Sequence, residues 1–341
     1  MVEIKDGNEI RTYSCPKCYL CGNEGKLLYE SLKDRLFGAP GEWNLKKCTN
    51  PECGLVWLDP MPVEEDIGKA YQNYYTHNDK PQHDKYLQTT SFIRLLLQIV
   101  YRTVTTIPSY ILGIKAEQFQ LSRMYLNKVK PCRLLEIGCG SSEFLSHMQI
   151  AGWEVEGIDF DAKAVENLRE KYGINIHLGS LESVQYPDNS FDAIAMNHVI
   201  EHIPNPVALL QECYRILKPG GYLVAVTPNI NSWGHQKFGA NWRGLETPRH
   251  IHIFSQTTLR ESANKSGFQK IETWTVASRS LSIFNGSFDI QKFGYHSMNK
   301  PDNQLHILKS LIFCYTEYIL LKILKINHEL GEEVVLFAQK N

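Results

Sequence analysis

A glycine-rich turn between an apolar run and a helix is the first feature of this sequence that could do chemistry. The stretch LLEIGCGSSEF contains Glu136 near the end of the apolar run, followed by Gly138 and Gly140. Glycine allows positive φ angles and lets the backbone approach a ligand closely. Ser141 or Ser142 would cap the next helix and leave its first N–H groups near that ligand. The stretch therefore predicts a loop wrapped around a nucleotide-like molecule.

Two carboxylates indicate the kind of nucleotide-like molecule. A dinucleotide loop has a third glycine where this chain has Glu143, and Glu136 would repel a pyrophosphate. Asp159, nineteen residues after Gly140, ends the next apolar segment, where a carboxylate can hydrogen-bond both hydroxyls of a ribose. A ligand with a ribose, a positive charge and no phosphate is S-adenosylmethionine. We therefore expect this cofactor rather than a nicotinamide or a flavin.

Histidines gather in two segments beyond the cofactor loop. The stretch NHVIEH places His198 and His202 one helical turn apart, directly after an apolar strand. The stretch PRHIHIF, inside the long segment 228–254, puts His250 and His252 on one side of an extended chain. Imidazole exchanges protons near neutral pH, so His202, His250 and His198 are candidate catalytic residues. We rank His202 and His250 equally as general bases, and burial as a core histidine is the alternative for each.

Cysteines are concentrated in the first 53 residues, in CPKCYLCGNEG and KKCTNPECGLVWLDP. Zinc prefers four thiolates in a tetrahedron, and a glycine after the second cysteine of each pair lets backbone N–H groups turn toward sulfur. We predict a small zinc ribbon whose structural metal is held by Cys18, Cys21, Cys48 and Cys53. Cys15 is the alternative ligand, and a reduced cysteine cluster without metal is the alternative interpretation.

The elements that must position these residues alternate along the chain. Strands are predicted at RLLEI, WEVEGID, NIHL, FDAIAM and YLVAVT, with helices over 142–151, 162–171 and 207–217. Such alternation predicts a mainly parallel α/β sheet with helices on both faces and a ligand at the carboxyl ends of its strands. We divide the chain into a ribbon (1–60), a helical connecting region (61–130) and a cofactor-binding domain (131–341) with an insertion at about 278–331. Aromatic and imidazole residues of the connecting region could line a substrate mouth, although a packing face is favoured: Tyr71, Tyr74, Tyr75, His77 and His83.

Composition narrows the range of partners. The formal net charge of −1 gives no bulk attraction to nucleic acid or to an anionic membrane. No apolar run reaches the ~18 residues of a membrane span, and we expect a cytoplasmic protein with a small-molecule partner. The segments 92–112 and 311–324 are amphipathic, so packing on the protein's own core is favoured for both. Peripheral contact with the inner membrane surface stays open as the alternative.

Longer motifs carry a resemblance to a known family. They are VEGIDFD, YPDNSFDAIAMNHVIEHIPNP, YRILKPGGYLVAVTPN and RHIHIFSQTTLRESANKSGF, which together with the glycine loop span roughly Pro131–Trp274. With them the chain resembles class I S-adenosylmethionine-dependent methyltransferases, of the bacterial type with an N-terminal zinc ribbon and a core like that of ubiquinone O-methyltransferases. The resemblance implies a Rossmann-like seven-stranded sheet whose last strand, Glu332–Gln339, is antiparallel.

The resemblance also implies roles for individual residues. The cofactor-binding set is Glu136 (amino group), Gly138, Cys139 and Gly140 (methionine part), Asp159 (ribose), Phe160 and Leu181 (adenine), and Asn197 (sulfonium). Ser180 stands where related chains often have an acidic residue that reads the adenine amino group, and Glu182 is a substitute for it. In the ubiquinone-type enzymes acidic residues and a histidine near His198 can bind a divalent cation, which leaves a second metal open.

The function implied is methyl transfer to an oxygen of a small molecule, such as a sugar or a surface-glycan or lipid-linked intermediate. C-methylation of a nucleotide-linked deoxysugar is one alternative. A non-catalytic protein that binds S-adenosylmethionine or docks through its ribbon is another. We expect the insertion at 278–331 to serve as a substrate lid, with dimer or membrane-surface contact as alternatives.

Overall fold

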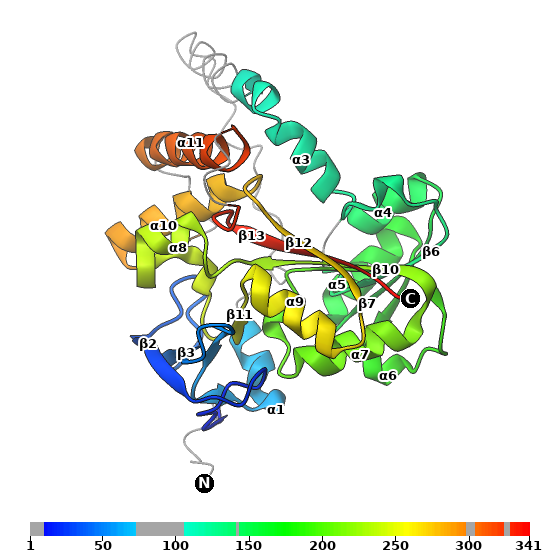
Figure 1. Ribbon diagram of the computed structural model, residues 1–341, viewed down its shortest axis with the longest axis horizontal. Coiled ribbons are helices and arrows are strands. Elements are labelled where there is room, and N and C mark those ends of the chain that lie inside the picture. The colour runs from blue at the N-terminus through cyan, green and yellow to red at the C-terminus, as the bar shows by residue number, and fades with distance from the viewer. Residues whose placement is uncertain (1–9, 73–105, 141–142, 298–303, 324–327) are drawn as a thin grey trace.

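The computed structural model describes residues 10–72, 106–140, 143–297, 304–323 and 328–341, and a seven-stranded sheet lies at its centre (Figure 1). The strands are β6 (Arg133–Ile137), β7 (Glu154–Asp159), β8 (Asn175–Leu178), β9 (Phe191–Asn197), β10 (Leu217–Pro228), β12 (Lys270–Val276) and β13 (Glu333–Gln339). Their order is β12-β13-β10-β9-β6-β7-β8, and β13 is antiparallel to both of its neighbours. The predicted seven-stranded sheet with an antiparallel last strand is confirmed.

Helices cover both faces of this sheet, as predicted. On one face pack α3 (Ile114–Leu121), α4 (Phe144–Ile150) and α5 (Ala162–Tyr172), and on the other α7 (Pro206–Ile216) and α9 (Gln256–Lys265). The central strand β6 is buried on both sides because Leu134 packs toward α4 and α5 while Leu135 packs toward α7. This explains why its sequence is a continuous apolar run rather than an alternating one.

Local signals set the ends of these helices and strands. Asp161 caps α5 by accepting hydrogen bonds from the N–H groups of Lys163 and Ala164, and α5 ends at Gly173 with a φ of 64°. Strand β10 begins at Leu217, earlier than the predicted strand YLVAVT, and its register with β9 shifts between Leu217 and Tyr222. The segment KPGG, which precedes the predicted strand, is therefore an irregularity inside one longer strand.

The cysteine-rich front end forms a second sheet that includes a strand from far along the chain. Strands β2 (Gly25–Leu32), β3 (Trp43–Cys48) and β4 (Val56–Leu58) are joined by β11 (His252–Ile253), which pairs with β4. Two short strands, β1 (Thr12–Tyr13) before β2 and β5 (Met61–Pro62) after β4, form a separate antiparallel pair. Trp57 and Leu45 of this part share one apolar core with Ile253 and Phe254. The division of the chain near residue 60 stays a prediction, but the two parts pack on each other.

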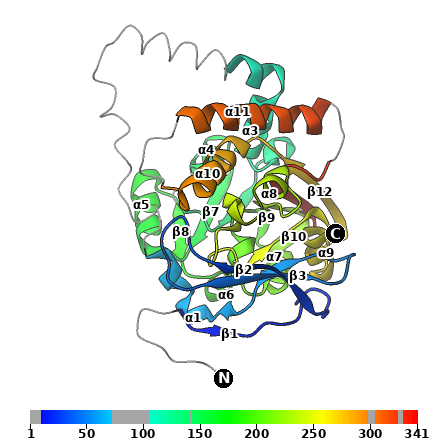
Figure 2. The same cartoon turned by 90° about the vertical axis from the view of Figure 1, so that its left-hand side faces the viewer.

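The remaining described elements lie in the connecting region and around the insertion. They are α1 (Glu64–Ile67), η1 (Gly68–Tyr71), η4 (Leu126–Lys128), α6 (Leu181–Val184), η5 (Ile200–His202), α8 (Trp233–Phe238), η6 (Gly239–Asn241), η7 (Arg243–Leu245), α10 (Ser280–Phe293), α11 (Gln304–Tyr318) and a π-helical turn, Ile319–Ile323. The predicted amphipathic helix around Leu311 is α11, which packs against α10 at the end of the molecule away from β2 and β3 (Figures 1 and 2). Tyr74, Tyr75, His77, His83 and most of segment 92–112 lie outside the described residues. Within the described ranges, no helix has both the length and the apolar character needed to cross a membrane.

Candidate active site

A cavity of about 790 Å³ opens at the carboxyl ends of the central strands. Its wall contains every residue that the sequence predicted for catalysis or cofactor binding: Glu136, Gly138, Cys139, Gly140, Asp159, Phe160, Leu181, Asn197, His198, His202 and His250. These residues come from the ends of β6, β7 and β9, from α6 and η5, and from the segment before β11. One cavity therefore joins the glycine loop to the histidine segments.

The glycine loop has the positive φ angles that its sequence predicts, but the predicted cap is wrong: the N-cap of α4 is Glu143, and Ser141 and Ser142 lie outside the described residues. Gly138 has a φ of +69°, and a Cβ at that position would lie 2.4 Å from Cγ2 of Val199. Gly140 has a φ of +50°, and its N–H donates to Oδ2 of Asp159 at 2.6 Å. The other carboxylate oxygen of Asp159 accepts the N–H of Asp161 at 2.8 Å. The two strand ends are thus tied together through the carboxylate of Asp159.

The residues around this loop fit S-adenosylmethionine. Glu136 and Asp159 are carboxylates only 2% and 5% exposed in the cavity wall, and burial raises the pKa of Asp159. Buried carboxylates are stabilised by donors, which the amino group and the ribose hydroxyls of this cofactor supply. The side chain of Cys139 is buried beside Gly157, so only its backbone is available to a ligand.

Phe160 and Ser180, at two positions considered for the adenine contact, interact with other residues of the protein. Phe160 is 65% exposed at the rim, and its ring meets the ring of Tyr71 edge-on at a centroid distance of 5.4 Å. Ser180, which stands where an acidic residue is common, caps α6 by accepting the N–H of Ser183 at 3.3 Å. The serine therefore has a local structural role, and Glu182 lies in the wall beside it.

His198 is held between two buried carboxylates. Its Nδ1 lies 3.1 Å from Oε1 of Glu201, and its Nε2 lies 2.6 Å from Oε1 of Glu333. Burial alone would lower the pKa of His198, but the hydrogen bonds and charges of both glutamates outweigh it and raise the pKa to about 9. A protonated imidazole has no lone pair to accept a proton. This geometry disfavours the predicted role of His198 as a general base.

His202 and His250 are oriented by backbone carbonyl groups rather than by carboxylates. Nδ1 of His202 lies 2.9 Å from the carbonyl oxygen of Arg249, and Nδ1 of His250 lies 2.8 Å from that of Gly244. Since a carbonyl can only accept, Nδ1 carries the proton in both hydrogen bonds, and Nε2 is the atom that holds the lone pair in the neutral form of each ring. The two rings meet edge-on with centroids 4.8 Å apart. The structure thus brings the two predicted bases together.

Carboxylates flank this histidine pair. Nε2 of His250 lies 3.9 Å from Glu201 and 4.0 Å from Glu246, and burial lowers the pKa of His250 to about 4. Burial would raise the pKa of Glu201, but His198 and the other histidines lower it to about 2. Atoms of Glu201, His202 and His250 come within 4.8 Å of one another. Both oxygens of Glu201 already bond protein groups, His198 and Thr227, and these bonds account for its position without a second metal.

The N-terminal part supplies cavity residues that were not predicted as site residues. Phe37, Glu64 and Tyr71 line the cavity, and the hydroxyl of Tyr71 lies 2.9 Å from Nδ1 of His202. Tyr71 belongs to the aromatic group noted in the sequence, which we expected to form a packing face. No sequence pattern marked Phe37 as a cavity residue. Its ring packs under the guanidinium of Arg249, which lies about two hundred residues further along the chain.

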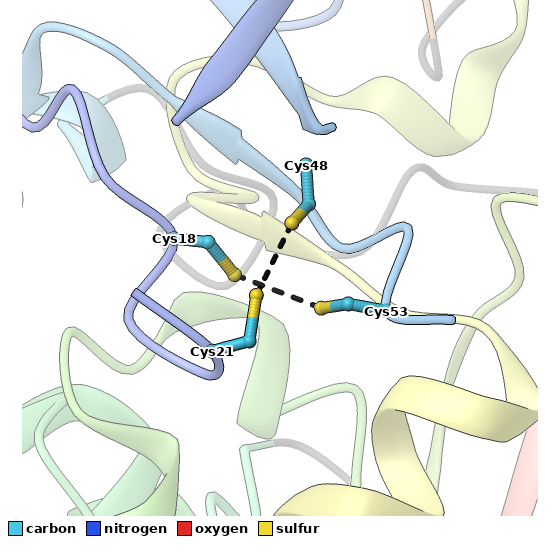
Figure 3. A group of neighbouring side chains, drawn as sticks. All are labelled: Cys18, Cys21, Cys48 and Cys53. Atoms are coloured by element: carbon cyan, nitrogen blue, oxygen red, sulfur yellow. Dashed lines mark hydrogen bonds between the residues drawn. The ribbon is translucent and has the colours of Figure 1, made fainter. Parts of the chain in front are cut away.

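The four predicted zinc ligands form a cluster outside this cavity (Figure 3). The Sγ atoms of Cys18 and Cys53 are 3.7 Å apart, those of Cys21 and Cys48 are 3.3 Å apart, and all four lie within 4.8 Å. Zn–S bonds of about 2.3 Å in a tetrahedron imply sulfur separations of about 3.8 Å, so the four thiols fit this ion. The glycines that follow Cys21 and Cys53 have φ angles of +77° and +67°. Cys15 is not part of the cluster.

Comparisons with known proteins agree with this arrangement. A family model described as a methyltransferase domain matches residues 116–273. A Mycolicibacterium smegmatis protein named "Probable S-adenosylmethionine-dependent methyltransferase" is 28% identical over 158 residues, which cover 45% of this chain and 56% of that protein. A ubiquinone biosynthesis O-methyltransferase of Cereibacter sphaeroides is 28% identical over 173 residues, covering 44% of this chain and 70% of the relative.

A similar solved structure is a SAM-dependent methyltransferase from Thermotoga maritima, with 20% identity and a TM-score of 0.43 over 69% of this chain and 99% of that one. The match to the first of these relatives covers only about half of its length. The family match contains the glycine loop, strands β6 to β10 and both histidine segments described above. Residues 116–273 of this chain thus match the model of a methyltransferase domain and supply most of a Rossmann-like sheet, and the sequence is similar to S-adenosylmethionine-dependent methyltransferases.

Proposed function

We propose that this chain transfers a methyl group from S-adenosylmethionine to a hydroxyl oxygen of a small molecule, with the His202–His250 pair as the general base. One observation carries this proposal. Both imidazoles donate Nδ1–H to backbone carbonyls and keep an Nε2 lone pair in the cavity that also contains Glu136 and Asp159. A hydroxyl nucleophile needs such a base, whereas a tertiary amine or a thiolate does not.

The surrounding residues support a proton transfer to this pair. Accepting the acceptor's proton turns an imidazole into a cation, and the ionised carboxylates of Glu201 and Glu246 lie 3.9 and 4.0 Å from Nε2 of His250, close enough to stabilise that charge. Burial would raise the pKa of Glu246, but the nearby His250 and Arg249 lower it, so this carboxylate is charged near neutral pH. S-adenosylmethionine supplies the methyl group, and much of the rate should come from holding the two reacting atoms in line in a cavity that excludes water.

Several acceptor classes are compatible with this chemistry. The relative named for O-methylation in ubiquinone biosynthesis supports an oxygen acceptor. We keep a sugar or a surface-glycan or lipid-linked intermediate as the proposed acceptor, and a quinol-like ring hydroxyl joins it on account of that relative. C-methylation of a nucleotide-linked deoxysugar and a non-catalytic cofactor-binding role remain the alternatives.

We also propose that the four-cysteine cluster binds one structural zinc ion. Four sulfur ligands leave no open coordination position for chemistry. The cluster lies beside the sheet that joins β4 to β11, and β11 begins two residues after His250. Zinc would therefore stabilise the support of the histidine pair rather than take part in methyl transfer.

The test is transfer of labelled methyl groups from S-adenosylmethionine to fractionated small-molecule extract, with identification of the labelled product. We expect an O-methylated product from the wild type and a decrease of 10²- to 10⁴-fold in the most affected of His202→Gln and His250→Gln. His147→Gln, an exposed histidine on α4, is the matched control and should keep full activity. A product methylated on carbon, or full activity in both histidine variants, would contradict the proposal.

A further inference from the structure

Arg243 occupies the part of the cavity wall where η7 meets α10. Its backbone N–H donates to the hydroxyl of Ser287 at 3.0 Å, and its side chain passes over Gly286. A Cβ at Gly286 would lie 2.4 Å from Cδ of Arg243. Ser282 and Ile283, one turn earlier on α10, line the same cavity. Arg243 thus lies along one face of α10 at the edge of the cavity.

Gly286 indicates that the path of this side chain is a specific feature of the fold. Glycine in the interior of a helix costs about 1 kcal/mol relative to alanine, and α10 continues for seven residues beyond it. Alanine at this position would collide with the aliphatic part of Arg243. The sequence therefore carries a helix-weakening residue at the point where the arginine crosses the helix.

The other cations around the cavity already have partners. Arg249 is paired with Asp34 and Glu246, Arg279 with Glu333, and His198 with Glu201 and Glu333. Arg243 differs from them. Among the residues that the structure describes, no carboxylate forms an ion pair with its guanidinium, and its buried Nε has no hydrogen-bond partner. Glu246 lies in the same segment, but its Oε1 accepts from Nε of Arg249 at 3.0 Å.

We propose that Arg243 binds an anionic group of the methyl acceptor, either a carboxylate or a phosphate. The proposal rests on the function proposed above and adds the chemical class of the substrate. A guanidinium presents two parallel N–H donors that match either anion, and buried donors without acceptors are rare in folded proteins. The next residue, Gly244, accepts the Nδ1–H of His250 at 2.8 Å. Arg243, which would bind the anion, and His250, one of the two proposed bases, therefore belong to one short segment. This segment fixes the distance between the bound anion and the reacting hydroxyl.

The experiment measures binding of small anions to the protein saturated with S-adenosylhomocysteine, by titration calorimetry. The probes are 4-hydroxybenzoate for a carboxylate and uridine diphosphate for a phosphate, with 4-hydroxybenzamide as the neutral analogue. We expect one anion class to bind, and the class that binds tells a carboxylate acceptor from a phosphate one. Arg243→Gln should weaken that binding at least tenfold, whereas Arg260→Gln, at an exposed arginine on α9, should leave it unchanged.

A second variant separates the position of the guanidinium from its presence. Gly286→Ala keeps the charge of Arg243 but displaces its side chain, so it should weaken binding of the anion as Arg243→Gln does. Binding of neither anion by the wild type, equal binding of the neutral amide, or unchanged binding in Arg243→Gln would each overturn the proposal. Loss of S-adenosylhomocysteine binding by the wild type would instead overturn the proposed function, so the two failures are distinguishable.

Discussion

Asp34 and Arg249 form a buried ion pair between the N-terminal sheet and the histidine segment. Nη1 of Arg249 lies 2.7 Å from Oδ2 of Asp34, and Nη2 lies 2.9 Å from Oδ1; both side chains are 0% exposed. Asp34 also accepts the N–H groups of Leu36 and Ala39, so the loop between β2 and β3 is built around this carboxylate. The carbonyl of Arg249 orients His202. The pair therefore joins the cysteine-rich part to the proposed base.

Replacing Asp34 should damage stability and methyl transfer together. Asp34→Asn removes the bidentate carboxylate and leaves the buried guanidinium of Arg249 with Glu246 alone. Breaking a buried ion pair typically costs about 3–5 kcal/mol. We expect a loss of that order in the free energy of unfolding, measured with urea, and a loss of methyl transfer. Glu42→Gln is the control, because Glu42 lies in the same loop but pairs with Lys33 on the exposed surface. An Asp34→Asn protein as stable as Glu42→Gln would show that the pair does not hold the two parts together.

The cysteine cluster gives a prediction about metal content. Cys53→Ser removes one of four sulfurs that lie within 4.8 Å, so the purified protein should lose its zinc and much of the stability of the N-terminal sheet. Cys15→Ser should keep one zinc per chain, because the Cys15 backbone N–H bonds Asp59 while its thiol lies outside the cluster. Elemental analysis of both proteins decides the ligand set. Zinc loss in Cys15→Ser with retention in Cys53→Ser would reverse the assignment.

Asp159 should control cofactor affinity. Its carboxylate holds the N–H groups of Gly140 and Asp161 and faces the expected ribose. Hydrogen bonds to a charged group contribute about 1.5–3 kcal/mol, so Asp159→Asn should raise the Kd for S-adenosylhomocysteine by about 10- to 100-fold in calorimetry. Glu154→Gln, at the exposed start of the same strand β7, should bind normally. Equal affinity in both variants would remove Asp159 from the cofactor site.

The local parts of the fold were predictable from sequence because their causes are local. The apolar run before Gly138, the cap Asp161 and the spacing between Gly140 and Asp159 determined the strand–loop–helix order, and the family motifs extended it to seven strands. The predicted residues at the ends of β6, β7 and β9 line one cavity for the same reason, whereas His250 belongs to the segment before β11, which pairs with the N-terminal sheet. The strand ends of a parallel sheet meet at one edge, so residues at those ends gather there.

Long-range contacts explain what the sequence did not reveal. The pairing of β11 with β4 and the ion pair of Asp34 with Arg249 join residues about two hundred positions apart, and no local pattern marks them. The charge of His198 is a similar case. NHVIEH indicates a histidine near the methyl group, but Glu333, which holds its Nε2, is 135 residues away. Protonation depends on such distant partners, so the sequence could not separate His198 from the two proposed bases.

The last prediction concerns the pH dependence that His198 confers on stability. Its pKa is about 9 in the folded protein, above the ordinary value of 6.5, because Glu201 and Glu333 outweigh burial. Its contribution to stability is therefore fully present below pH 6.5 and is lost as the pH rises through 9. His198→Gln should be less stable than the wild type at pH 6, and this difference should shrink by about 3 kcal/mol at pH 9.5. Urea unfolding at both pH values measures it. His147→Gln should show no such change, and a difference for His198→Gln that is equal at pH 6 and pH 9.5 would mean that the imidazole is neutral between its two carboxylates.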